Sequence, residues 1–252
     1  MTSFQLTNKV ILVNGGSRGI GEAFAREFAR RGATVIVTSR KQDGVDAVVE
    51  AIKAEGGKAA GKACHTGDPA QIDALFEWVE AEFGRLDGLV NNAATNPYFG
   101  PFIEAPESAF DKTFEVNVKG YFMMAQRACR LMVKCGGGSI VNIASIEGIS
   151  PSPMMAIYSM SKAAVIMMTK TIAKEMGGAG VRCNCICPGL TETKFAKVLI
   201  DTPEIREAQV GKTPLARHAQ PEEMAGAAVY LLSDAASFTT GAILTVDGGA
   251  VI

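Results

Sequence analysis

The chain is poor in several residues on which particular functions depend. It has two histidines, His65 and His218, and a single tryptophan, Trp78, among 252 residues. Neither histidine neighbours a nucleophilic side chain in the sequence, which gives little support to a hydrolase that uses a Ser–His pair. Trp78 falls within a helical pattern, where packing explains it better than ligand binding does.

The sequence also lacks long runs of one character. No apolar stretch approaches the ~20 residues that a membrane-spanning helix needs, and no block of like charges interrupts a chain whose formal net charge is −1. A nucleic-acid or anionic-membrane partner favours a concentrated basic face, so neither is expected. Segment 1–8 does not have the character of a secretory signal, and the final Ala-Val-Ile is neither a peroxisomal address nor a lipidation box. We therefore expect a cytoplasmic protein.

Cysteine is present, but not in a pattern that indicates a metal site or a disulfide framework. Six cysteines occur, and Cys183, Cys185 and Cys187 alternate along one segment. On a strand this spacing places all three on one face, where each behaves as a small apolar side chain. Zinc ligands need a different spacing and a histidine nearby. We expect buried, reduced thiols and no metal.

The chain is rich in short apolar segments that alternate with longer helical patterns. Six segments have the character of strands, at 9–14, 34–38, 86–91, 139–144, 181–187 and 242–246. Helical patterns separate most of them, as in the stripe formed by Ile72, Leu75, Phe76, Val79 and Phe83. This alternation predicts a parallel sheet with right-handed crossovers.

The length of the chain fits one large α/β domain or two small ones. No linker, charge block or repeat divides the sequence. We predict a single domain over residues 1–252, with a doubly wound Rossmann-type α/β fold, about seven parallel strands and helices on both faces.

A glycine-rich stretch lies between the first predicted strand and the first helix. In this stretch Gly15 permits a tight turn, Gly19 allows the backbone to approach a pyrophosphate, and Gly21 allows close packing of helix on strand. The free N–H groups at the helix start favour phosphate. Such a stretch alone also fits a flexible turn, but the strand before it and the helix after it favour dinucleotide binding.

The end of the second predicted strand bears on which nicotinamide cofactor is bound. An acidic residue there would bond the ribose hydroxyls and repel a 2′-phosphate. This strand is instead followed by Ser39, Arg40 and Lys41. Arg40 and Arg18 together would clamp a phosphate through charge-assisted hydrogen bonds, although two solvated surface arginines are the alternative. The charges predict NADP(H) rather than NAD(H).

Tyr158 and Lys162 are four residues apart and therefore share one face of a helix. Hydride addition to a carbonyl creates an alkoxide that must be protonated, and a free tyrosine, with a pKa of about 10, is a poor base near neutrality. An adjacent ammonium favours the phenolate, so we expect Lys162 to lower the pKa of Tyr158. Ser145 follows an apolar strand, where ligands bind in this architecture, and is expected to hold the substrate oxygen.

These motifs resemble those of the short-chain dehydrogenase/reductase family, and the resemblance extends from Lys9 to Gly249. The family usually opens Thr-Gly-x3-Gly-x-Gly; here Asn14 replaces the threonine, and its side chain is expected to bond neighbouring backbone. Asn-Asn-Ala-Ala at 91–94 stands where the family more often has Asn-Asn-Ala-Gly, and Val-Asp-Gly-Gly at 246–249 is similar to its C-terminal signature.

The resemblance implies a catalytic tetrad and a set of cofactor-binding residues. Asn117 would complete the tetrad with Ser145, Tyr158 and Lys162 and support a water relay to Lys162, which would also bond the nicotinamide ribose. Thr191 and Thr193 would meet the carboxamide, and His65 stands where an aspartate often contacts the adenine. The implied cofactor-binding residues are Gly15, Ser17, Arg18, Gly19, Ile20, Gly21, Ser39, Arg40, His65, Thr66, Asn92, Ala93, Tyr158, Lys162, Pro188, Gly189, Thr191 and Thr193. A homotetramer is the assembly that the family suggests.

Within the family, the segments 39–42, 96–100 and 150–153 look most like the NADPH-dependent carbonyl/retinal reductases. The expected substrate wall comes from 95–102, from 146–157 and from an approximate lid at 190–213. Its apolar side chains favour an apolar or aromatic ketone or aldehyde over a sugar. The candidate substrate contacts are Tyr98, Phe99, Met154 and Met155.

Two other functions remain open on the sequence. A 3-oxoacyl carrier-protein reductase would need a basic docking patch, for which one helix offers Arg127, Arg130 and Lys134. A non-catalytic NADP(H)-binding protein is less favoured, because such a protein would be expected to lack the tyrosine or the lysine.

Helices near 113–134 and 158–176 carry apolar residues on more than one face and so are expected to be covered by other subunits.

Overall fold

The computed structural model describes residues 3–252, which form a seven-stranded, fully parallel sheet in the order β3-β2-β1-β4-β5-β6-β7. The strands are β1 (Val10–Asn14), β2 (Thr34–Thr38), β3 (Lys58–Gly61), β4 (Gly88–Asn91), β5 (Gly138–Ile143), β6 (Val181–Pro188) and β7 (Ile243–Val246). The helices are α1 (Gly19–Arg30), α2 (Gln42–Ala54), α3 (Pro69–Phe83), α4 (Glu107–Phe114), α5 (Tyr121–Lys134), α6 (Ala156–Met176), α7 (Lys197–Asp201), α8 (Pro203–Val210) and α9 (Ala225–Leu232). The predicted fold class is confirmed.

The edge strand β3 has no counterpart among the six segments predicted from the sequence. Its residues Lys58-Ala-Ala-Gly61 include no β-branched or aromatic side chain, and none of them is fully buried. An edge strand has a neighbour on only one side, so its apolar signal is weaker than that of the central strands. The other six strands lie within one or two residues of their predicted bounds, which is the usual variation at element ends.

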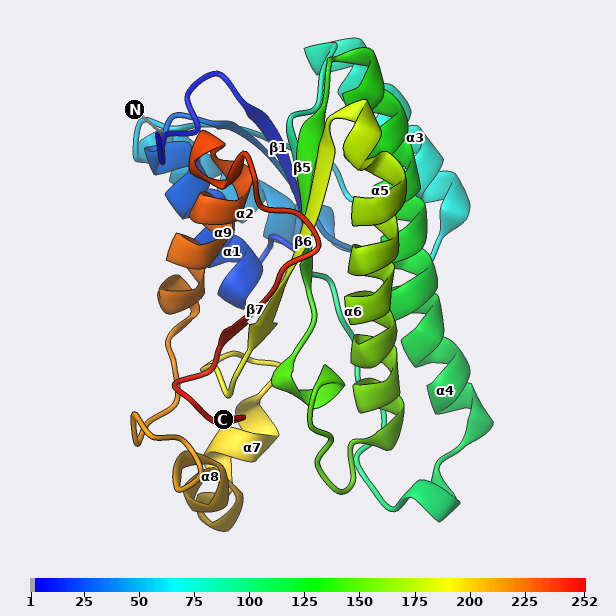
Figure 1. Ribbon diagram of the computed structural model, residues 1–252, viewed down its shortest axis with the longest axis vertical. Coiled ribbons are helices and arrows are strands. Elements are labelled where there is room, and N and C mark those ends of the chain that lie inside the picture. The colour runs from blue at the N-terminus through cyan, green and yellow to red at the C-terminus, as the bar shows by residue number, and fades with distance from the viewer. Residues whose placement is uncertain (1–2) are drawn as a thin grey trace.

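Two apolar layers cover the two faces of the sheet (Figure 1). Helices α1, α2 and α9 lie on one face and contribute Phe24, Phe28, Val49 and Val229 to its core. Helices α3, α5 and α6 lie on the other, where the predicted stripe of α3 is buried through Ile72, Leu75, Phe76 and Val79. Trp78 packs edge-on against Phe83, with ring centroids 5.6 Å apart, as expected of a structural residue.

The three alternating cysteines of β6 are buried side chains of the sheet. Cys183 belongs to the core under α3 and α5, whereas Cys185 and Cys187 pack with Tyr121 and Val165. All three are free thiols with no exposed surface. Burial raises the pKa of the Cys183 thiol, which keeps it protonated and apolar. The prediction of buried thiols is confirmed.

Residues 3–252 contain neither of two further kinds of structure. Within that range no helix has both the length and the apolar character needed to span a bilayer. No cluster of three or more His, Cys, Asp or Glu side chains with a metal-binding arrangement occurs there either.

The order of the strands locates the site. β1 pairs with β2 on one side and with β4 on the other, so the chain winds outward in opposite directions from this point. At such a reversal the loops beyond the carboxyl ends of the strands diverge and leave a crevice.

Candidate active site

A cavity of about 980 Å³ opens beyond the carboxyl ends of β1, β4, β5 and β6. It contains three of the four predicted catalytic residues, Ser145, Tyr158 and Lys162. It also contains every predicted cofactor-binding residue except Gly21; these are Gly15, Ser17, Arg18, Gly19, Ile20, Ser39, Arg40, His65, Thr66, Asn92, Ala93, Tyr158, Lys162, Pro188, Gly189, Thr191 and Thr193. Residues separated by as many as 178 positions therefore surround one space.

The glycine-rich loop between β1 and α1 has the shape of a phosphate-binding cradle. Gly15 and Gly19 have φ angles of +76° and +56°, a region that residues with a Cβ adopt only at a cost. A Cβ on Gly15 would lie 2.6 Å from the Ala93 nitrogen, and one on Gly19 would lie 3.2 Å from Thr193 Cγ2. At Gly15 and Gly19 the cavity wall thus consists of bare backbone, as the close approach of a pyrophosphate requires.

Gly21 does not line the cavity. It supports the glycine loop from outside the cavity lining. It is buried in α1, where a Cβ would overlap the carbonyl oxygen of Gly15 and lie 2.6 Å from Asn92 Nδ2. The same Asn92 amide donates to the Gly15 oxygen at 3.0 Å. The predicted packing role of Gly21 is confirmed.

The substitution Gly21→Ala is therefore expected to destabilise the fold, because the new methyl group forces α1 away from β4 and the glycine loop. Overpacking of this kind costs about 1–3 kcal/mol. Thermal or urea unfolding measures the effect, and Gly226→Ala is the matched control. Gly226 lies exposed in α9 with no atom within 4 Å of an added Cβ, so alanine there should stabilise by about 0.5–1 kcal/mol. Equal effects at both sites would contradict the packing role.

Asn14, at the end of β1, has a different partner from the one expected. Its Oδ1 accepts a hydrogen bond from Thr66 Oγ1 at 2.9 Å, and its Nδ2 has no partner in the structure. The expectation that this side chain bonds neighbouring backbone is wrong. The amide instead joins the glycine loop to the segment after β3, which places His65 and Thr66 at the cavity wall.

The wall beyond β2 is positively charged. Arg18 and Arg40 both line the cavity, both are exposed, and neither forms an ion pair with any side chain that the structure describes. Ser17 Oγ donates to Ser39 Oγ at 2.9 Å, so the glycine loop is connected directly to the end of β2. The carboxylates that line the cavity, Glu147 and Glu192, come from the loops after β5 and β6.

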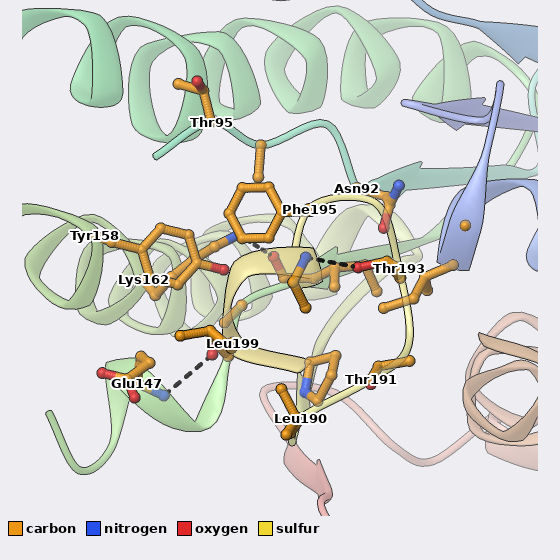
Figure 2. Close-up of a pocket in the computed structure, with 18 of the residues that line it drawn as sticks. Asn92, Thr95, Glu147, Tyr158, Lys162, Leu190, Thr191, Thr193, Phe195 and Leu199 are labelled. Atoms are coloured by element: carbon orange, nitrogen blue, oxygen red, sulfur yellow. Dashed lines mark hydrogen bonds between the residues drawn. The ribbon is translucent and has the colours of Figure 1, made fainter. Parts of the chain in front are cut away.

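Tyr158 and Lys162 lie one turn apart on α6, and both are buried, with 8% and 1% of their surface exposed. Lys162 Nζ donates to the Ile143 carbonyl at 2.8 Å and lies 5.5 Å from the centre of the Tyr158 ring (Figure 2). Burial lowers the pKa of Lys162 to about 8. The helical spacing of Tyr158 and Lys162 thus brings them to one place, as predicted.

The pKa of Tyr158 departs from the expectation. Burial raises it above its ordinary value, the charge of Glu147 raises it further, and a hydrogen bond with the Ser145 side chain lowers it by less. A lowered pKa was predicted from the adjacent ammonium, but removing the phenolate from water has the larger effect here. In the structure the Tyr158 hydroxyl therefore keeps its proton and can donate a hydrogen bond.

The buried ammonium predicts a pH-dependent effect of Lys162→Met. The pKa of Lys162 is about 8 in the fold against an ordinary 10.5, so between these values the unfolded chain binds more protons and stability rises with pH. The methionine variant lacks this rise. We expect the melting temperature of the variant minus that of the unaltered chain to fall as the pH increases from about 8 toward 10.5, measured by calorimetry without cofactor. A constant difference would contradict the buried charge.

Asn117 occupies a π-helical segment (Glu115–Gly120) between α4 and α5 and does not line the cavity. Its Oδ1 accepts from the Thr95 nitrogen at 2.9 Å, and its Nδ2 donates to the Thr95 oxygen at 3.0 Å and to Ser161 Oγ at 3.1 Å. The amide oxygen and nitrogen of Asn117 thus hydrogen-bond Thr95 and Ser161, and the relay to Lys162 stays a prediction. It fixes the cavity wall at Thr95 to α6 at Ser161.

Of the four candidate substrate contacts, Phe99, Met154 and Met155 line the cavity and Tyr98 does not. The Tyr98 hydroxyl donates to the Pro101 oxygen at 2.9 Å, which holds the ring in its own loop. Sequence reasoning named no substrate-contacting side chain in 190–213, yet Phe195 faces Tyr158 with ring centroids 5.7 Å apart (Figure 2). Its aromatic character within a predicted wall segment was the available signal.

Comparisons with known proteins agree with this arrangement. A family model described as Enoyl-(Acyl carrier protein) reductase matches residues 15–251. The chain is 40% identical over 246 residues to Dehydrogenase/reductase SDR family member 4 of Bos taurus, covering 98% of this chain and 88% of the relative. It is 38% identical to the 3-oxoacyl-[acyl-carrier-protein] reductase FabG of Thermotoga maritima, covering 98% and 100%.

Among solved structures, a gluconate 5-dehydrogenase from Burkholderia cenocepacia in complex with NADP and tartrate superposes with a TM-score of 0.95. It is 32% identical, and the match covers 98% of this chain and 96% of the other. Fold, cavity and relatives together define a nicotinamide-dependent oxidoreductase. The chain belongs to the short-chain dehydrogenase/reductase family.

Proposed function

We propose that this enzyme transfers a hydride between NADP(H) and a ketone or aldehyde and its alcohol, with Tyr158 as the acid and base. The observation that carries the proposal is the buried Tyr158–Lys162 pair beside Ser145, in a cavity that also contains a glycine cradle and two exposed arginines. A non-catalytic binding protein would not need to retain this pair, since burying an ammonium is costly.

The residues present fit a dinucleotide. Gly15, Gly19 and the start of α1 offer backbone to the pyrophosphate, and Arg18 and Arg40 offer positive charge to a 2′-phosphate. Lys162 and Thr193 stand where the nicotinamide end would lie by family resemblance. When bound, the nicotinamide supplies or accepts the hydride.

The side chains of this chain perform the proton transfer. As carbon gains a hydride, the carbonyl oxygen gains negative charge, which the hydroxyls of Ser145 and Tyr158 stabilise by hydrogen bonding. Tyr158 then gives its proton to that oxygen, and the C=O group becomes CH–OH. Lys162, bonded to the Ile143 oxygen, stabilises the resulting phenolate. Because its pKa is raised, Tyr158 enters the reaction protonated, and the more basic alkoxide can take that proton.

The cavity beside Tyr158 favours an apolar or aromatic carbonyl compound. Its wall combines Phe99, Met154, Met155, Phe195 and Leu199. The segment 190–213 includes the short helices α7 and α8, which lie together at the lower end of the molecule, apart from the two helical layers (Figure 1). We propose that it acts as the substrate lid.

The second candidate, a 3-oxoacyl carrier-protein reductase, is supported by the Thermotoga relative. The expected basic docking helix does not support it, because Arg127 and Lys134 of α5 form ion pairs with Asp73 and Glu80 of α3. Neither residue lines the active cavity.

The exposed Phe122 and Val133 on α5 and Met167 on α6 support a paired assembly, which we propose to be a homotetramer.

Consumption of NADPH over a panel of carbonyl compounds tests the proposal. An aromatic 1,2-diketone is expected to turn over faster than a 3-oxoacyl thioester. The reverse order would favour the second candidate. If the protein binds NADPH but reduces no carbonyl compound in the panel, a non-catalytic NADP(H)-binding protein would be the function that remains.

A further inference from the structure

Glu147 is a cavity-lining carboxylate that the proposed reaction does not use. It lies in the short helical turn Ile146–Gly148, two residues after Ser145. Its backbone nitrogen donates to Ser145 Oγ at 3.1 Å (Figure 2). Its carboxylate accepts three hydrogen bonds, from Ser152 N at 2.9 Å, from Ser152 Oγ at 2.6 Å and from Ser159 Oγ at 2.9 Å.

These contacts join three parts of the site. Ser152 belongs to the wall segment 149–155, whereas Ser159 is buried on α6, directly after Tyr158. In the same segment Met154 has a φ of +72° and its carbonyl accepts from the Gly100 nitrogen at 3.1 Å. A methionine in the left-handed region is strained and persists only where surrounding contacts enforce it. The carboxylate of Glu147 thus helps to hold the wall in a conformation that it would not adopt alone.

Glu147 also places a negative charge inside the cavity. Its hydrogen-bond donors are neutral, and no cation forms an ion pair with it among the side chains that the structure describes. The charge reaches the reacting group, because it contributes to the raised pKa of Tyr158. The described lysines that line the cavity do not neutralise this charge by an ion pair. Lys162 Nζ hydrogen-bonds the Ile143 oxygen, Lys112 forms an ion pair with Glu115, and Lys194 and Lys212 are exposed.

We propose that Glu147 is a positioning and specificity-determining residue, which fixes the wall 149–155 to α6 and excludes substrates that carry a carboxylate next to the reacting carbonyl. The preferred substrates are therefore uncharged near the carbonyl, as in a 2-keto ester or a diketone, and 2-keto acids are rejected. This inference rests on the proposed carbonyl reduction and adds to it the charge of the substrate.

A matched pair of probes isolates the charge. Methyl benzoylformate and benzoylformate share the phenyl ketone and differ by one methyl group and one negative charge. In the unaltered enzyme kcat/KM for the ester should exceed that for the acid. In Glu147→Gln, which keeps the size and one acceptor oxygen, the ratio should fall about tenfold or more, as expected for removing one charge at short range in a partly buried site.

Two further variants separate charge from packing. Ser152→Ala removes one hydrogen bond of the wall but keeps the carboxylate, so KM should rise for both probes and their ratio should stay. Glu104→Gln makes the same chemical change at an exposed residue outside the cavity and should alter neither. Calorimetric titration of the two probes into each NADP-loaded variant gives a second reading that does not need turnover.

The outcomes are distinguishable. If the ester is reduced but the ratio is the same in Glu147→Gln as in the unaltered enzyme, the inference is wrong and the proposed function stands. An equal fall of the ratio in Ser152→Ala would assign the effect to packing and also overturn it. If neither probe is reduced, the proposed function fails for this substrate class, and the binding ratio alone decides the role of Glu147. Failure of both probes to bind any variant overturns the inference.

Discussion

Replacing Tyr158 by phenylalanine is expected to lower kcat for carbonyl reduction by about 10²–10⁴-fold, the usual contribution of a positioned general acid. The ring would remain, since it packs in a buried site 5.7 Å from the Phe195 ring. The hydroxyl that gives its proton to the new alkoxide would be lost. Because the cradle for the pyrophosphate lies elsewhere in the cavity, the affinity for NADPH should change little.

Three measurements make this result specific. NADPH fluorescence titration and thermal unfolding show that the variant is folded and binds cofactor, and a stopped assay gives kcat. Tyr230→Phe is the matched control, since it removes a hydroxyl that hydrogen-bonds Thr239 at 2.9 Å, and neither residue lines the cavity; it should leave kcat unchanged. If Tyr158→Phe still reduced ketones at the original rate, the proposed acid would be wrong.

Reversing the charge of Arg40 should invert the cofactor preference. Arg40→Asp removes a charge-assisted bond worth about 1.5–3 kcal/mol and introduces repulsion against a 2′-phosphate, so the KM for NADPH should rise roughly ten- to a hundredfold. The ribose of NADH carries no such phosphate, and an aspartate at this place can accept from its hydroxyls. The KM for NADH should therefore stay constant or fall.

The neighbouring lysine provides the control for this experiment. Lys41 is exposed and does not line the cavity, so Lys41→Asp changes the net charge equally without removing a proposed phosphate contact. Its effect on the KM for NADPH should be much smaller and should diminish at high salt. An equal rise of the two KM values in Arg40→Asp would argue that the arginine only supports the loop.

The fold could be predicted from the sequence because the central strands consist largely of branched apolar residues. Val10–Asn14 and Thr34–Thr38 are buried on both faces, which produces the continuous apolar runs of a covered parallel sheet. β3 escaped prediction because an edge strand made of lysine, alanine and glycine carries no such pattern. Tyr158 and Lys162 were predictable for a similar reason, since a helical turn alone brings them together.

Other parts of the site depend on contacts that spacing does not determine. The direction of the Asn117 amide follows from a π-helical turn that places Thr95 and Ser161 beside it. Tyr98 and Phe99 are adjacent in sequence, yet one bonds its own loop and the other faces the cavity. The pKa of Tyr158 follows from the burial of the whole pocket, which no single motif encodes.

The pairing of β1 with β4 has a consequence for how the enzyme assembles. Val13 meets Val90 across the sheet, so the crevice beside Gly15 arises only after a chain segment of more than seventy residues has closed. Such non-local contacts must form before the entropy lost in closing the loop is recovered, which slows folding. A nucleotide can therefore bind only the assembled sheet, and through mass action it acts as a ligand that shifts the folding equilibrium toward the native state. The stability of the fold should then rise with the concentration of free dinucleotide.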